Sequence, residues 1–426
     1  MELFVFLGSL FVLLFTGIPI GVVLMLCSVI LLWWLDMFDT LLLSQQMIMG
    51  TDNFILTTIP FFILAGEIMK HGGISNRLIS FAKFLVGRFR GGMGYVGIMA
   101  CTLFAGLSGV AIADVSALGS VLIPMMVLCG YDKARATGLV CSAALTAPII
   151  PPSLPMIVLG VTVELSIGKL FMMGIVPGLM LAGTLMVTWF FVVRHDGYHD
   201  IEILPMNRFF PVLIDAFPAL LLPIIIIVGI RMGLFTPTEG GAVACVYAFF
   251  VAVVLNRELK WHMIPDVFFG AIKGSAVVMF IVSTAYTIGW LITIAQVPAQ
   301  IITLFQGMVD SPIMLMITLN LLLLALGMVM DLTPIILIFA PVIYPLIRAA
   351  GIDPYYFAIV MIVNLCVGLL TPPVGTVLYV GCSVSGLKLG QVVKGILPFL
   401  AAELLFLLAL ILFPPLITVP AGWFAG

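Results

Sequence analysis

Two proline-rich segments interrupt otherwise apolar stretches of this sequence and carry its clearest chemical signal. They are residues 147–155 (APIIPPSLP) and residues 370–376 (LTPPVGT). Consecutive prolines remove backbone donors and clash with the preceding turn, so each segment is expected to split a helix into two halves joined by an extended loop. Carbonyls freed at the end of the first half suit a cation, and N–H groups freed at the start of the second half, near Ser153, Gly375 and Thr376, suit an anion. The alternative for each segment is a simple proline kink.

Two further segments join flexible glycines to an acidic residue inside apolar sequence. They are residues 106–114 (GLSGVAIAD), which end at Asp114, and residues 327–333 (GMVMDLT), which contain Asp331. A carboxylate in such surroundings is costly and usually functional. Carbonyl, hydroxyl and carboxylate oxygens without His or Cys suit a hard cation such as Na⁺ rather than a transition metal. The alternative is that each carboxylate caps a tight turn, and capping does not exclude ion binding.

The composition of the chain indicates the environment in which these residues lie. Of the 426 residues, 63% are hydrophobic and only 8% are charged, whereas soluble domains carry roughly 25% charged residues. A mean hydropathy of +1.32 excludes an ordinary soluble enzyme and predicts an all-α polytopic membrane protein in contact with a lipid bilayer. A net charge of −2 leaves no basic face for nucleic acid. The chain has no phosphate-binding loop of the GxxxxGK type, so we do not expect it to hydrolyse ATP itself. If it transports a solute, the energy would come from an ion gradient.

The two halves of the chain resemble each other. The sequence can be shifted along itself so that Gly106 falls on Gly327. The same shift places Pro151 and Pro152 on Pro372 and Pro373, and further pairs also match. These pairs include Gly130 with Gly351, Asp132 with Asp353, and Gly174 with Gly395. Such a run of matches indicates an internal duplication.

The duplication predicts the domain organisation. Residues 1–193 form a first repeat, 194–211 a cytoplasmic linker, and 212–426 a second repeat. The first repeat is expected to contain scaffold helices at 1–70, an arm at 75–90, a re-entrant hairpin at 92–128 and a Pro-broken helix at 134–163. The second is expected to contain scaffold helices at 213–293, an arm at 296–310, a hairpin at 312–348 and a broken helix at 355–383. If each repeat crosses the membrane five times, the two repeats are inverted.

The positive charges support this topology. With the N-terminus outside, thirteen of the Lys and Arg residues fall in segments predicted to be cytoplasmic, against Lys169, Arg231 and Arg348 outside. Residues 2–35 leave an alternative open, because they could form one kinked helix instead of two crossings. Lys273 lies inside a predicted crossing, where it could meet an anion or simply extend to the membrane surface. Glu403 lies inside the last crossing and could face a polar contact or another subunit.

Several separated motifs together resemble a known family. The runs APIIPPSLP (147–155), GLSGVAIAD (106–114), IPFFILAGEIM (59–69), GMVMD (327–331) and LLTPPVGT (369–376) look like the large membrane subunit of tripartite ATP-independent periplasmic (TRAP) transporters. The resemblance implies an elevator-type secondary transporter in the bacterial inner membrane, driven by Na⁺. It also implies two partners, a small (Q-type) membrane subunit and a periplasmic binding protein that delivers an organic acid. More distantly, the chain resembles the divalent-anion/sodium symporters.

Carried onto this sequence, and extended through the repeat, the resemblance implies two Na⁺ sites and a substrate site. The first Na⁺ site would comprise Gly106, Ser108, Asp114, Thr146, Pro148 and Ser153. The second would comprise Gly327, Asp331, Thr333, Thr371, Gly375 and Thr376. The substrate would bind near Ser153, Gly375, Thr376 and Lys273.

Other functions remain possible from the sequence. A stand-alone Na⁺ or H⁺ symporter would need no binding protein. An intramembrane enzyme would have to bring Asp114 and Asp331 together as a carboxylate pair, and a non-transporting scaffold would not need duplicated breaks. Sialate or another sugar acid such as a keto-gulonate, and a C4-dicarboxylate, all fit an anion site made of backbone N–H groups.

Overall fold

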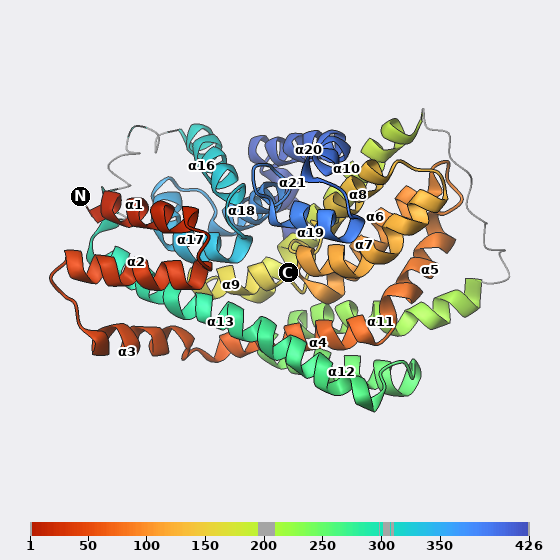
Figure 1. The fold of residues 1–426 in the computed structure, drawn as a ribbon, viewed down its shortest axis with the longest axis horizontal. Helices are drawn as coiled ribbons and strands as arrows, with labels where there is room; N and C mark the ends of the chain where they lie inside the picture. The colour runs from red at the N-terminus through yellow and green to blue at the C-terminus, as the bar shows by residue number, and fades with distance from the viewer. Residues whose placement is uncertain (1, 195–208, 298, 301–306, 308–310, 425–426) are drawn as a thin grey trace.

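Helices and the loops between them make up the part of the chain that the structure, a computed structural model, describes (Figure 1). The described residues are 2–194, 209–297, 299–300, 307 and 311–424. Eight helices in this part are long and apolar enough to cross a membrane: Phe54–His71, Ala111–Leu128, Ile167–Val193, Phe209–Arg231, Pro237–Leu255, Trp261–Ile294, Leu332–Ala349 and Leu389–Leu412. The prediction of an all-α, multi-pass membrane protein is therefore confirmed. Most of the predicted linker at 194–211 and of the predicted arm at 296–310 lies outside the described residues.

The first set of helices surrounds one long helix. The set comprises α1 (Glu2–Phe15), α2 (Ile20–Trp34), α3 (Thr40–Thr51) and α4 (Thr58–His71), and the long helix is α13 (Ile264–Ile294). Helices α1 and α2 pack against each other as two separate helices, and α2, α3 and α4 all contact α13 (Figure 1). The contact with α3 is close, because a Cβ atom on Gly50 would lie 2.6 Å from Cβ of Tyr286. Ser283 also donates a 2.7 Å hydrogen bond to the carbonyl of Met47. The absence of a side chain at Gly50 allows α3 to approach α13 closely, and the hydrogen bond from Ser283 joins the two helices.

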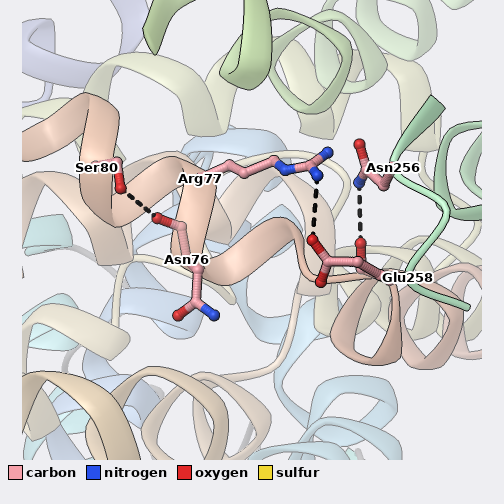
Figure 2. A network of polar contacts seen from close by, with 6 residues as sticks. Asn76, Arg77, Ser80, Asn256 and Glu258 are labelled. Atoms are coloured by element: carbon pink, nitrogen blue, oxygen red, sulfur yellow. Dashed lines mark hydrogen bonds and ion pairs between the residues drawn. The ribbon is translucent and has the colours of Figure 1, made fainter.

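An amphipathic helix, α5 (Ile74–Val86), follows α4 within the segment predicted as an arm. It begins after Gly73, whose φ is +70° and whose absent side chain leaves room for the Glu258 carboxylate. Arg77 of α5 donates a 3.1 Å bond to Glu258, and Asn256 donates a 2.9 Å bond to the carbonyl of Gly72 (Figure 2). These contacts fasten the start of α5 to the loop between α12 (Pro237–Phe250) and α13.

The same order of elements then occurs twice along the chain. Each time, a pair of helices is followed by a helix that is interrupted at a proline pair and by a long helix. The first series is α6 (Gly92–Ser108), α7 (Ala111–Leu128), α8 (Lys133–Ala144), α9 (Leu154–Thr162) and α10 (Ile167–Val193). The second is α16 (Pro312–Gly327), α17 (Leu332–Ala349), α18 (Pro354–Gly368), α19 (Thr376–Ser385) and α20 (Leu389–Leu412). Helix α11 (Phe209–Arg231) precedes α12, and α21 (Pro415–Phe424) follows α20.

The two series interlock at the centre of the molecule. Helix α7 of the first packs against α19 of the second, and α17 of the second packs against α9 of the first (Figure 1). Each short helix after a proline pair is therefore covered by a helix from the other series. The first interruption is buried, whereas Pro373 in the second is exposed.

Candidate functional site

The loop between α6 and α7, which we call tip 1, lies against the first interruption, residues 145–153, which we call break 1. Gly109 in tip 1 has a φ of +64°, and a Cβ atom on it would lie 2.5 Å from the carbonyl oxygen of Pro152 and 3.3 Å from Cα of Ser153. A Cβ atom on Gly106, in the last turn of α6, would lie 2.9 Å from Cγ of Pro223 on α11 and, at ordinary contact distance, 3.6 Å from the carbonyl oxygen of Pro151. Gly109 thus lets the backbone of tip 1 touch the backbone of break 1.

Asp114 lies in the first turn of α7 and is fully buried. One carboxyl oxygen, Oδ1, accepts a hydrogen bond from the hydroxyl of Ser108. The other, Oδ2, has no hydrogen-bond partner among the described residues. The bond from Ser108 therefore satisfies only one oxygen of the carboxylate, and the other oxygen is free to bind a cation.

Break 1 is buried and its hydroxyl groups are bonded locally. Thr146 donates a 2.7 Å hydrogen bond to the carbonyl of Ala143, and Ser153 donates to the carbonyl of Pro148. Ser153 is also the N-cap of α9, because its Oγ accepts from the N–H of Met156. Each hydroxyl keeps a lone pair, so it can still act as a ligand while it donates to a carbonyl.

The loop between α16 and α17, tip 2, meets the second interruption, residues 369–375, or break 2. The carbonyl of Met328 in tip 2 accepts hydrogen bonds from the N–H groups of Val374 (3.2 Å) and Gly375 (3.3 Å). Gly327 and Gly368 pack backbone to backbone, since a Cβ atom on Gly327 would lie 3.0 Å from Cα of Gly368. Tip 2 is thus hydrogen-bonded to break 2, whereas tip 1 only packs against break 1.

Polar side chains gather around break 2 as well. Asp331 is the N-cap of α17, and the side chain of Thr376 at the start of α19 lies near its carboxyl group. The buried Thr376 Oγ1 nevertheless has no hydrogen-bond partner among the described residues. Thr333 is buried in the first turn of α17, and Thr371 donates a 2.8 Å bond to the carbonyl of Val367. A carboxyl group and a hydroxyl group therefore lie close together at the start of α19.

Lys273 lies on α13, which contains neither break. Its side chain is exposed on α13, and the neighbouring glycines Gly270 and Gly274 face Glu67 and Ile63 of α4. This position favours a lysine that extends to the membrane surface over one that binds the substrate near the breaks.

A cavity of about 700 Å³ opens beside the second half of the first broken helix. It lies between the end of α9, at Gly160, and the turn between α11 and α12. Two cationic residues, Lys169 and Arg231, line it. The ammonium group of Lys169 lies 4.1 Å from the ring centroid of Tyr355. The cavity thus has two cationic residues in its lining and lies at the end of α9 that is remote from break 1.

Sequence reasoning missed a buried pair of amides beside break 2. Asn364 of α18 donates 2.8 Å hydrogen bonds to the backbone carbonyl and to Oδ1 of Asn320 on α16. The Oδ1 atom of Asn364 has no partner among the described residues. The signal that could have revealed the pair was the occurrence of single Asn residues within long apolar runs, which are costly in a membrane unless paired.

Comparison with known proteins identifies the family. Residues 7–416 match the model for the DctM component of tripartite ATP-independent periplasmic transporters. A 2,3-diketo-L-gulonate TRAP transporter large permease protein of Escherichia coli, YiaN, is 45% identical over 99% of this chain and 100% of its own. The sialic acid TRAP transporter large permease protein SiaM of Vibrio cholerae is 37% identical, with 94% of each chain covered. The C4-dicarboxylate TRAP transporter large permease protein DctM of Pseudomonas aeruginosa is 38% identical, with 89% of each chain covered.

The fold also resembles a solved structure of a membrane protein. The structure of Neisseria gonorrhoeae MtrF, described among antimetabolite efflux pumps, superposes with a TM-score of 0.57 over 86% of this chain and 83% of that one, at 12% identity. This similarity shows a shared fold. With a family match over almost the whole chain and eight apolar helices, the protein is a multi-pass protein of the bacterial inner membrane, and it belongs to the DctM component family, the large permease subunits of TRAP transporters.

Proposed function

We propose that this chain imports an organic acid coupled to the Na⁺ gradient. A periplasmic binding protein delivers the acid, and a small Q-type membrane subunit completes the permease. The observation that carries the proposal is that each tip lies on a proline break, with an acidic residue and partnerless oxygen atoms beside it. Oxygen atoms from carboxyl, hydroxyl and carbonyl groups favour a hard monovalent or divalent cation.

Two Na⁺ sites follow from this chemistry. The first uses the free Oδ2 of Asp114, with Ser108 and Gly106 from tip 1 and Thr146, Pro148 and Ser153 from break 1. The second uses Asp331, Gly327 and Thr333 from tip 2 and Thr371, Gly375 and Thr376 from break 2. The support is the burial of Asp114 and the partnerless Thr376 Oγ1. A carboxylate and a hydroxyl that lack partners gain most from a bound cation.

The substrate binds between the starts of α9 and α19. Ser153 stands at the first start, and Gly375 and Thr376 stand at the second. The N-terminus of a helix carries a partial positive charge, so each of these two starts attracts a carboxylate. Lys169 and Arg231 in the neighbouring cavity draw the anion toward it. Because the relative named for diketo-L-gulonate is 45% identical and those named for sialic acid and C4-dicarboxylates are 37% and 38% identical, a sugar acid is the first substrate to test.

Transport follows an elevator mechanism. The two series of helices are inverted repeats, and their hairpins and broken helices form a moving domain. Helices α1–α4 and α11–α13 form the scaffold, with α5 as an arm between the two. Na⁺ orders the tips on the breaks and so raises the affinity for the substrate, and by linkage the substrate raises the affinity for Na⁺ equally.

The experiment is uptake into proteoliposomes that contain this chain and its small subunit, with a panel of sugar acids and C4-dicarboxylates. We expect uptake that requires both Na⁺ and the cognate binding protein. Accumulation that continues when K⁺ replaces Na⁺ would overturn the coupling. Accumulation without any binding protein would instead support a stand-alone symporter.

A further inference from the structure

Glu403 is a buried carboxyl group that lies outside both breaks. It stands in the membrane-spanning helix α20, and its side chain is 0% exposed. Among the described residues, neither carboxyl oxygen has a hydrogen-bond partner, and none of the ion pairs involves Glu403. A charged carboxylate without a partner is strongly unfavourable in such surroundings. The group must therefore be neutralised by a proton or by a bound cation.

The groups that face Glu403 are neutral. Ser142 of α8 lies beside it, and Ser142 Oγ also lacks a hydrogen-bond partner in the described part of the chain. The nearby titratable groups are the buried thiols of Cys141 on α8 and Cys366 on α18. Of the other helices that pack on α20, α19 brings Cys382 near Cys141, and the ammonium group of Lys169 on α10 is engaged with the ring of Tyr355. Helix α16 contains no titratable residue.

The crossing of α8 and α20 keeps Glu403 in place. A Cβ atom on Gly138 would lie 2.7 Å from the backbone of Gly395, and one on Gly395 would lie 2.1 Å from the carbonyl oxygen of Ala134. Ser142 follows Gly138 by one turn of α8, and Glu403 follows Gly395 by two turns of α20, so both side chains lie on the same side of this crossing. The close contact of the two backbones holds α8, and with it Ser142, against α20.

The number of oxygen atoms distinguishes a proton from a metal cation. Three partnerless oxygen atoms meet here, two from Glu403 and one from Ser142. Ser142 lies in the last turn of α8, where the carbonyls of Ser142, Ala143 and Ala144 already accept hydrogen bonds from the N–H groups of Leu145, Thr146 and Ala147. Hard cations take roughly six or more oxygen ligands. We propose that Glu403 is protonated and that its carboxyl O–H group donates a hydrogen bond to Ser142 Oγ. This neutral pair joins α8 to α20 just before break 1.

Infrared spectroscopy of the full chain in lipid nanodiscs at neutral pH tests the proposal. We expect the difference spectrum between wild type and Glu403→Gln to contain the C=O band of a protonated carboxyl group, with a downward shift in D₂O. We expect Ser142→Ala to move this band to higher frequency, because the carboxyl group loses its acceptor. The exposed Asp36→Asn is the control and should remove carboxylate bands only.

Three results would overturn the proposal. The first is a difference spectrum for Glu403→Gln with carboxylate bands in place of the C=O band. The second is a C=O band that Ser142→Ala leaves unmoved, a result that does not depend on whether Glu403→Gln folds. The third is a C=O band that disappears from the wild type when Na⁺ replaces K⁺, because a metal cation would then compete for the site.

Discussion

Gly109 and Pro152 touch through their backbones, and this contact joins tip 1 to break 1. A Cβ atom on Gly109 would lie 2.5 Å from the carbonyl oxygen of Pro152. Gly109 also has a φ of +64°, which residues with a side chain rarely adopt. Both the space and the backbone conformation at this position therefore require glycine, and any larger residue must separate the tip from the break.

Gly109→Ala is expected to weaken Na⁺ binding. The left-handed conformation alone costs a residue with a Cβ atom about 1–2 kcal/mol, and the contact with Pro152 adds to this. We expect the Na⁺ concentration for half-maximal uptake to rise about tenfold, which corresponds to about 1.4 kcal/mol. Gly97→Ala, in α6 with no atom within 4 Å of its added Cβ, is the matched control and should transport like the wild type. If both variants lose the same amount of Na⁺ affinity, the contact of tip 1 with break 1 is not what holds the ion.

Asp114→Asn tests the first Na⁺ site. The substitution removes the charge but keeps the shape, so the bond from Ser108 can persist while the free oxygen loses its attraction for a cation. We expect at least a tenfold rise in the Na⁺ concentration for half-maximal uptake, or about 1.4 kcal/mol. Asp36→Asn removes an exposed carboxylate and serves as the control for the change in net charge. An unchanged Na⁺ dependence in Asp114→Asn would show that Asp114 serves only as the acceptor for Ser108.

Local chemistry explains which parts of this fold could be predicted. A proline has no N–H group, so an interruption between Ala144 and Leu154 follows from the sequence itself, as does one between Gly368 and Thr376. The apolar composition likewise predicts helices that cross a membrane. The amino-acid sequence alone therefore indicates which residues could form the site, although their role as ligands stays a prediction.

Contacts between distant segments could not be predicted in the same way. Hydropathy placed Lys273 and Glu403 inside crossings but did not indicate which face of the helix each side chain occupies. The structure exposes Lys273 on α13 and buries Glu403 beside Ser142 of α8. Both outcomes depend on how helices pack, and packing of α8 on α20 depends on Gly138 and Gly395, which lie far apart in the chain.

Lys169→Gln tests whether the positively charged cavity guides the substrate. Electrostatic attraction raises the local concentration of an anion, and salt screens it. We expect the KM for the organic acid to rise about threefold at low ionic strength, an increase that fades as salt is added. Lys260→Gln removes an exposed lysine at the other end of α12 and is the control. Equal KM values for the two variants at low salt would show that the cavity is not on the path of the substrate.

The variant Thr376→Val tests whether the hydroxyl group of Thr376 is a Na⁺ ligand or only part of the structure. Thr376 Oγ1 is buried near Asp331 and has no hydrogen-bond partner in the described part of the chain, so Val removes an unsatisfied group and keeps the shape of the side chain. A buried polar group without a partner costs about 1–3 kcal/mol, so the Tm of the Na⁺-free protein should stay level or rise. If the hydroxyl binds Na⁺, the stabilisation that Na⁺ gives to the wild type should shrink, and about ten times more Na⁺ should be needed for uptake. Thr184→Val is the matched control, because its hydroxyl only donates to the carbonyl of Met180 on α10. A Thr376→Val protein that Na⁺ stabilises as strongly as the wild type would remove Thr376 from the second site.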